Sequence, residues 1–248
     1  MSQKSVEPRV ALIPTPSLDP KSHGAVRAAV EMTLVHNCLI RAVNSIYYHA
    51  PYVTTTKDIR DFLHFCAIFV EVTLHHHDGE ETYIFPPWAE QTNCPALLKE
   101  NHAEHRLFHH GFEQLSRYAK TTDPSAYKSE DLLAILEDFT DPLAAHLTNE
   151  IDSILRMQEY SSEVAKKIFK EGVQKSMEGA DKADHLPFLF GTHDKTFEGG
   201  KHYFPPVGFL LNAALMFWYG SKNAGAWRFC PSDLYSRPRK PTLGPNAA

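Results

Sequence analysis

The chain has 248 residues, 43% of them hydrophobic and 22% charged, so it is long and apolar enough to bury a sizeable core. Its 25 Lys and Arg against 30 Asp and Glu give a net charge of −5, and no basic block interrupts the helical region, which argues against nucleic acid as a partner. No apolar run of signal-peptide or membrane-spanning length is found near the start, which favours a cytoplasmic protein with no transmembrane segment. The four cysteines form no CxxC pair and are predicted to be reduced thiols: Cys38, Cys66, Cys94 and Cys230.

Scattered prolines and a lack of periodicity predict an irregular arm over residues 1–19. The first helix is expected after Asp19, which would be its N-cap with Pro20 as the first helical residue, and it continues to about His49. His36 lies on the apolar stripe of this helix. The residues that define the stripe lie one or two turns from His36: Met32, Leu39, Ile40 and Val43.

A second helix is predicted to begin near Thr56 and to run into a stretch rich in His and Glu over residues 75–81. Apolar residues recur along one of its faces: Phe62, Phe65, Phe69 and Val72. Pro86 and Pro87 are expected to end this helix, because proline lacks the backbone N–H and clashes with the preceding turn.

Two further helices follow the same apolar periodicity. The third is predicted from about Pro95 to Tyr118, and the fourth from near Ser129 to about Met157, with a kink at Pro142. The expected buried side of the third helix consists of Leu98, His105, Phe108, Phe112 and Leu115.

Four amphipathic segments with short connections and no strand alternation predict an all-α protein, an antiparallel up-down-up-down four-helix bundle over residues 20–158. Residues 159–248 form a C-terminal extension, with a charged helix over 161–177 and then a sequence rich in Gly, Pro and aromatics. We expect a cap over one end of the bundle, which either closes a substrate pocket near His193 and Asp194 or is purely structural. The aromatic residues expected to be buried in this cap are Phe204, Phe209, Phe217 and Trp218.

A histidine and a glutamate four residues apart occur in two of the predicted helices, as His76 with Glu80 and as His146 with Glu150. Side chains at this spacing share one helix face, and here that face is the apolar one. Because an unpaired carboxylate is costly to bury, inward Glu residues beside histidines indicate hydrogen-bonded pairs or metal ligands.

The other two helices each add an inward histidine, His36 and His105, so that all four helices contribute to one central site. Four imidazoles and two carboxylates exceed the four ligands of a structural zinc site and better fit two ions with bridging carboxylates. Iron is the first choice of metal and manganese the alternative. Such a site favours redox chemistry with dioxygen over hydrolysis.

The run from His76 to Pro86 resembles the H-x-x-x-E-E-x-x-x-F-P signature of the hemerythrin-like, or HHE cation-binding, family. Segments in the other three predicted helices resemble the remaining motifs of that family in the right order. The resemblance implies a four-helix bundle with a non-haem di-iron centre of two iron ions. By position it implies these metal ligands: His36, His76, Glu80, His105, His146 and Glu150.

Two positions depart from the oxygen-carrying members of the family. Those proteins use a further histidine four residues after the third-helix ligand, and His109 stands there, so it is a candidate extra ligand. They also use an aspartate five residues after the fourth-helix histidine, where this chain has Ile151; Glu150 matches the HHE variant instead. This puts a reversible oxygen-carrier role in doubt.

The residues beside the signature ligands are interpreted as ordinary surface or core residues, because successive helix positions rotate by about 100°. This concerns His75, His77 and Glu81. A register shifted by one residue would instead pair His77 with Glu81 as ligands. His102 is either a hydrogen-bond partner of the site or solvent-facing.

Two functions of different classes follow from these observations. The first is a di-iron protein that binds and activates dioxygen or peroxide to oxidise a small organic substrate, as the large aromatic extension suggests. The second is a protein that binds or senses oxygen, nitric oxide or iron without turnover. The hypothesis of a scaffold that has lost its metal is weaker, because residues suited to all six ligand positions are present. A ferritin-like site would need Glu-x-x-His pairs, and the chain has none.

Overall fold

The computed structural model describes residues 7–93 and 96–247, without the side chains of residues 96–100 and 209. Cys94, the expected helix start at Pro95, and the side chains of Leu98 and Phe209 lie outside the described residues. Within the described ranges the chain is helical and forms no strand, which confirms the all-α prediction. None of the helices described is both long and apolar enough to cross a membrane.

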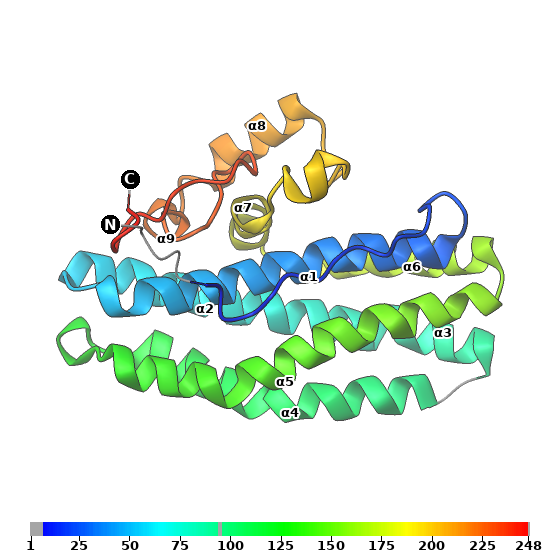
Figure 1. Ribbon diagram of the computed structural model, residues 1–248, viewed down its shortest axis with the longest axis horizontal. Helices are drawn as coiled ribbons and strands as arrows, with labels where there is room; N and C mark the ends of the chain where they lie inside the picture. Colours follow the sequence, from blue (N-terminus) through cyan, green and yellow to red (C-terminus); the bar gives the residue numbers. More distant parts are fainter. Residues whose placement is uncertain (1–6, 94–95, 248) are drawn as a thin grey trace.

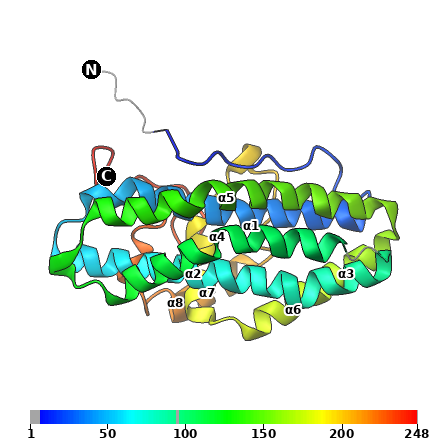
Figure 2. The same cartoon turned by 90° about the horizontal axis from the view of Figure 1, so that it is seen from below.

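Four long helices lie side by side and form a helical bundle (Figures 1 and 2). Helix α5 packs against both α1 and α4, and α2 packs against α4. Pro142 does not end α5, which continues through it as one element. The four helices are α1 (Gly24–His49), α2 (Thr56–Gly79), α4 (Ala96–Thr121) and α5 (Ser129–Leu155).

The first helix begins later than the sequence predicts. Its N-cap is His23, whose Nδ1 accepts a hydrogen bond from the backbone N–H of Ala25 at 3.1 Å. Asp19 instead stabilises the preceding turn, where its side chain accepts from the N–H of Lys21. The second helix begins where predicted, because the hydroxyl of Thr55 accepts from the N–H of Asp58.

Pro86 and Pro87 do not end the second helical segment as expected. A π-helical turn, Glu80–Ile84, follows α2 directly and leads into α3 (Phe85–Thr92). The prolines occupy the first turn of α3, directly after the π turn, whose hydrogen bonds span five residues and interrupt the α-helical ladder at this point. Such π turns are frequent at functional sites.

The C-terminal extension lies along the flank of α1 and α2, not over one end of the bundle (Figure 1). Helix α6 (Ser162–Gly179) packs against α1 and the π turn, and α7 (Lys182–Thr192) packs against α1 and α2. Helix α8 is Phe209–Tyr219 and α9 is Ala224–Trp227. Short helical turns at Ala50–Tyr52, Pro124–Ala126, Arg156–Glu159 and Phe197–Gly200 complete the elements.

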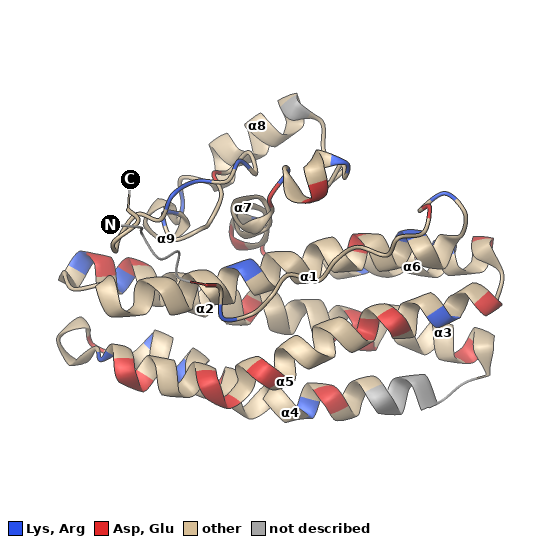
Figure 3. Cartoon of the chain, viewed as in Figure 1, with Lys and Arg blue, Asp and Glu red and all other residues tan. Residues whose placement is uncertain are grey.

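The aromatic residues of the extension are not buried as the sequence suggests. Phe217 and Trp218 are 79% and 74% exposed on α8, a helix that Figure 3 shows without charged side chains, and Phe204 is half-buried. The extension is instead fixed to the bundle by Trp227 and Phe229, which are buried. Because α8 contacts mainly α7, its outer face remains uncovered in the described chain.

Gly111 determines how closely α4 and α5 approach. A Cβ atom at this position would lie 2.5 Å from the Cβ of Phe139. We expect Gly111→Ala to lower the free energy of unfolding by about 1–3 kcal/mol, because overpacking outweighs the gain in helix propensity of about 0.5–1 kcal/mol. Urea unfolding measures this, with Gly208→Ala as the control, since a Cβ there meets no atom within 4 Å. Equal midpoints for the two variants would contradict this packing.

Candidate metal centre

The structure brings together the six residues singled out in the sequence and adds His77. They form two groups, in each of which the candidate ligand atoms lie within 4.8 Å of one another. Glu80 belongs to both groups and so stands between them. One group is His36, His76, Glu80 and Glu150, and the other is His77, Glu80, His105 and His146.

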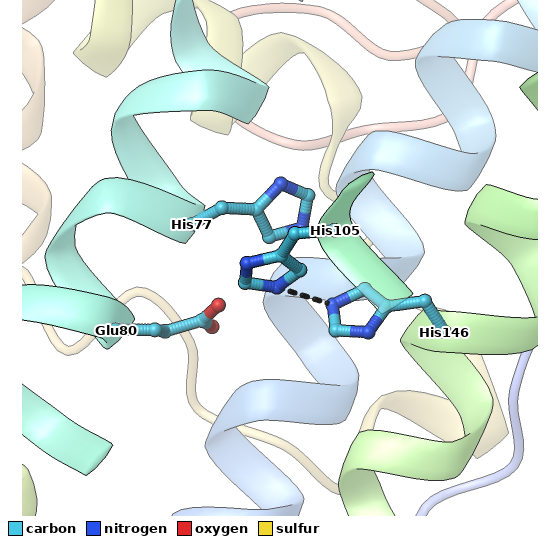
Figure 4. A group of neighbouring side chains, drawn as sticks. All are labelled: His77, Glu80, His105 and His146. Carbon is cyan, nitrogen blue, oxygen red and sulfur yellow. Dashed lines mark hydrogen bonds between the residues drawn. The ribbon is translucent and has the colours of Figure 1, made fainter. Parts of the chain in front are cut away.

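Helix α2 and the π turn that continues it supply three of these residues, His76 and His77 from the helix and Glu80 from the turn. His77 lies three residues before Glu80 and His76 lies four before it, and both spacings place side chains on the face that carries Glu80. The interpretation of His77 as a residue turned away from the site is therefore wrong: it is 4% exposed, and its ring centroid lies 4.5 Å from that of His105. Figure 4 shows His77, Glu80, His105 and His146 directed toward one another.

Three of the imidazole rings are held in one orientation by hydrogen bonds from Nδ1. Each Nδ1 lies within hydrogen-bond distance of an oxygen acceptor, so this nitrogen carries the hydrogen and Nε2 presents a lone pair to the centre of the bundle. The three contacts are His36 to the carbonyl of Leu147 at 2.7 Å, His105 to Glu81 Oε1 at 2.5 Å, and His146 to Glu104 Oε2 at 2.9 Å.

These orientations leave electron-rich atoms facing each other. The Nε2 atoms of His105 and His146 are 3.0 Å apart (Figure 4), and Nε2 of His36 is 3.1 Å from Glu150 Oε2. Glu80 and Glu150 are 1% and 0% exposed, and none of their carboxylate oxygens has a hydrogen bond of good geometry in the described chain. One cation in each group would satisfy these atoms, so the donor set fits metal ions.

Burial controls the proton affinities of the site. It lowers the pKa of His146 to about 4 and that of His77 well below its usual range, which keeps both imidazoles neutral and able to donate a lone pair. Burial, together with the neighbouring carboxylate of Glu150, raises the pKa of Glu80 well above its usual range. A cation placed between the two carboxylates would reverse this last effect.

The remaining histidines and acids near the site do not enter either group. His109 is directed outward, with its side chain 59% exposed and Nδ1 3.6 Å from Glu113 Oε1, so the structure does not bring this candidate extra ligand to the centre. Glu81 holds His105 from outside and also receives His102 at 2.9 Å. His102 is therefore an outer partner of the site although it is 43% exposed.

Comparison with known proteins agrees with this arrangement. The chain is 40% identical over 222 residues to the dimeric xanthone biosynthesis cluster protein R11 of Cryptosporiopsis sp. (strain 8999), an alignment that covers 90% of this chain and 85% of the relative. No solved structure gives a significant match. The hemerythrin HHE cation binding domain matches residues 22–157, the part that carries all the residues of both groups. The chain therefore belongs to the hemerythrin HHE cation-binding domain family.

Proposed function

We propose that this protein holds a non-haem di-iron centre that binds and activates dioxygen to oxidise a small organic substrate. The observation that carries the proposal is the shared Glu80, which stands between two groups of inward-facing donor atoms, most of them without a hydrogen-bond partner in the described chain. Imidazole nitrogen and carboxylate oxygen together suit iron, with manganese as the alternative.

The chain's own residues would each have a distinct role at this centre. Glu80 would bridge the two ions, and Glu150 with His36 and His76 would complete one side. His77, His105 and His146 would complete the other side, so that His77 joins the six ligands inferred from the sequence. The carboxylates of Glu81 and Glu104 would fix the rings and raise the basicity of the ligating nitrogens. When bound, two reduced iron ions supply electrons to dioxygen.

The relative's name assigns that protein to a cluster for dimeric xanthone biosynthesis. By analogy, we propose that this chain acts in a biosynthetic pathway, a role with which the oxidation of an organic molecule is compatible. Its large extension supports the same interpretation, because residues beyond the family match cover a flank of the bundle next to His76.

We further propose that the protein acts in the cytoplasm. Cys38, Cys66 and Cys230 are buried and unbridged, as expected of a protein that stays in a reducing compartment. Burial raises the pKa of the Cys38 thiol to about 11, so this thiol stays protonated and unreactive at neutral pH.

Metal content and dioxygen uptake test the proposed function. Protein purified without air should contain two iron ions per chain and, with a reductant, should consume dioxygen continuously when its substrate is supplied. Reversible oxygen binding without consumption of reductant would favour a carrier or sensor. A single zinc ion, or no metal, would contradict the proposal. His109→Ala is the matched control, because it removes an exposed histidine from α4.

A further inference from the structure

A cavity of about 140 Å³ lies between the bundle and the extension, directly against the metal-binding residues. His76 and Glu80 form part of its wall, and the opposite wall comes from α6 and α7. The His76 side chain is 15% exposed, whereas those of His36 and Glu150 are 0% exposed. The cavity is therefore a route by which a molecule can reach one side of the candidate centre.

The outer wall of the cavity is formed by residues that follow the family match, which ends at residue 157. Phe169, Val173 and Met177 of α6 and Leu189 of α7 make this wall apolar. A cavity of about 150 Å³ with such a lining accommodates one benzene ring. The size and lining thus favour a single aromatic ring.

Apart from the candidate ligand atoms of His76 and Glu80, one polar side-chain atom of the residues described on the cavity wall has no hydrogen-bond partner. The Nδ1 of His185 lies 2.9 Å from the backbone carbonyl of Asp181, an acceptor, so Nδ1 carries the hydrogen and Nε2 presents a lone pair. This Nε2 is buried and makes no hydrogen bond within the described chain. Burial also lowers the pKa of His185, which keeps the ring neutral near pH 7.

His75, the other histidine on the wall that belongs to neither ligand group, already has hydrogen-bond and ring contacts. His75 donates from Nε2 to the carbonyl of Ser176 at 3.0 Å, and its ring packs edge-to-face on that of His185 with centroids 4.7 Å apart. No Lys or Arg is among the described lining residues, so no side chain of this wall carries a positive charge that would compensate an anionic ligand. The complementary ligand is therefore neutral and carries a hydrogen-bond donor for His185.

We propose that this cavity binds a phenol, with its ring between α1, α2, α6 and α7 and its hydroxyl group donating a hydrogen bond to Nε2 of His185. The ligand is either a free phenol or one phenolic ring of a larger molecule. That the phenol is the substrate rests on the proposed function. That a phenol binds in this cavity does not depend on it.

Calorimetric titration without air tests the binding, with phenol, toluene and benzoate as probes and the protein carrying the metal with which it is purified. Phenol should bind one per chain and about fivefold more tightly than toluene, which has nearly the same shape but no hydroxyl, because a neutral hydrogen bond contributes about 1 kcal/mol. Benzoate should not bind. Equal affinities for phenol and toluene in the unmodified protein would overturn the proposal.

Variants of the cavity wall locate the site. His185→Phe should remove the preference for phenol over toluene, and Val173→Phe should weaken the binding of both, because Val173 lies 40% exposed on the outer wall and a larger ring there narrows the cavity. Their controls are His110→Phe, an exposed histidine on α4, and Gln174→Phe, an exposed neighbour on α6; neither should change binding. His185→Leu replaces His185→Phe should the latter fail to fold.

Metal content is measured in every variant and should match that of the unmodified protein. Binding of phenol without dioxygen consumption would contradict the proposed function and leave the phenol site intact. Conversely, the unmodified protein could consume dioxygen while neither His185→Phe nor Val173→Phe alters phenol binding. That result would overturn the phenol site and leave the proposed function intact.

Discussion

Glu80→Ala should remove both metal ions from the protein, whereas His36→Ala should remove one. Glu80 is the residue common to the two ligand groups, and His36 belongs only to the group with His76 and Glu150. Loss of the shared carboxylate therefore withdraws a ligand from both ions and removes the bridge between them. Metal analysis after dialysis against a weak chelator gives the number of ions per chain.

A substitution in the other ligand group, at His77, tests the second ion in the same way. His77→Ala should also leave one ion, but at the His36 side, so that the double variant His36→Ala/His77→Ala behaves like Glu80→Ala. His109→Ala should retain both ions, because its side chain is directed outward. If Glu80→Ala keeps both ions, or if His77→Ala binds metal like the unmodified protein, the two-group assignment is wrong. Far-UV circular dichroism checks that the helices persist.

The sequence was sufficient to predict an all-helical fold, because apolar residues recur at helical spacing in four segments. It also singled out inward residues that the structure gathers at one place, since the HxxxE spacing and the lone histidines each mark one helix face. It failed at His77. A rotation of about 100° per residue suggested that only one of two adjacent histidines could face inward. In the structure, positions three and four before Glu80 both reach the centre.

Other features depend on contacts between segments distant in the sequence. The acceptors that orient the imidazoles are Leu147, Glu81 and Glu104, and each comes from a helix other than the one that carries its histidine. No local pattern distinguishes these acceptors from surface carboxylates. The cavity at His185 was equally hidden, because it exists only where α6 and α7 cover α1 and α2. His193 and Asp194, near which the sequence suggested a substrate pocket, do not line the cavity next to His76.

The free energy of unfolding of the metal-free protein should show how much the buried carboxyl groups of Glu80 and Glu150 destabilise the fold. Glu80 and Glu150 lie together, buried and without hydrogen bonds of good geometry. Replacing both with glutamine removes the charge while nearly conserving shape. We expect the metal-free Glu80→Gln/Glu150→Gln protein to exceed the metal-free unmodified protein in free energy of unfolding by about 1–3 kcal/mol, because the amides remove the buried acidic groups and offer N–H donors to the acceptor atoms that face them.

Adding metal should reverse that order. The unmodified protein should gain about 4 kcal/mol per site at a metal concentration a thousand times the dissociation constant, because the cation binds the folded state alone. The glutamine variant should gain little, so the two stabilities cross as metal is added. Urea unfolding with chelator or with excess Mn²⁺ measures both, and Glu113→Gln, at an exposed glutamate, is the control. A variant less stable than the unmodified protein in both conditions would mean that these carboxylates serve structure. The crossing would instead show that the chain keeps an unfavourable pair of carboxyl groups in its core in order to bind cations.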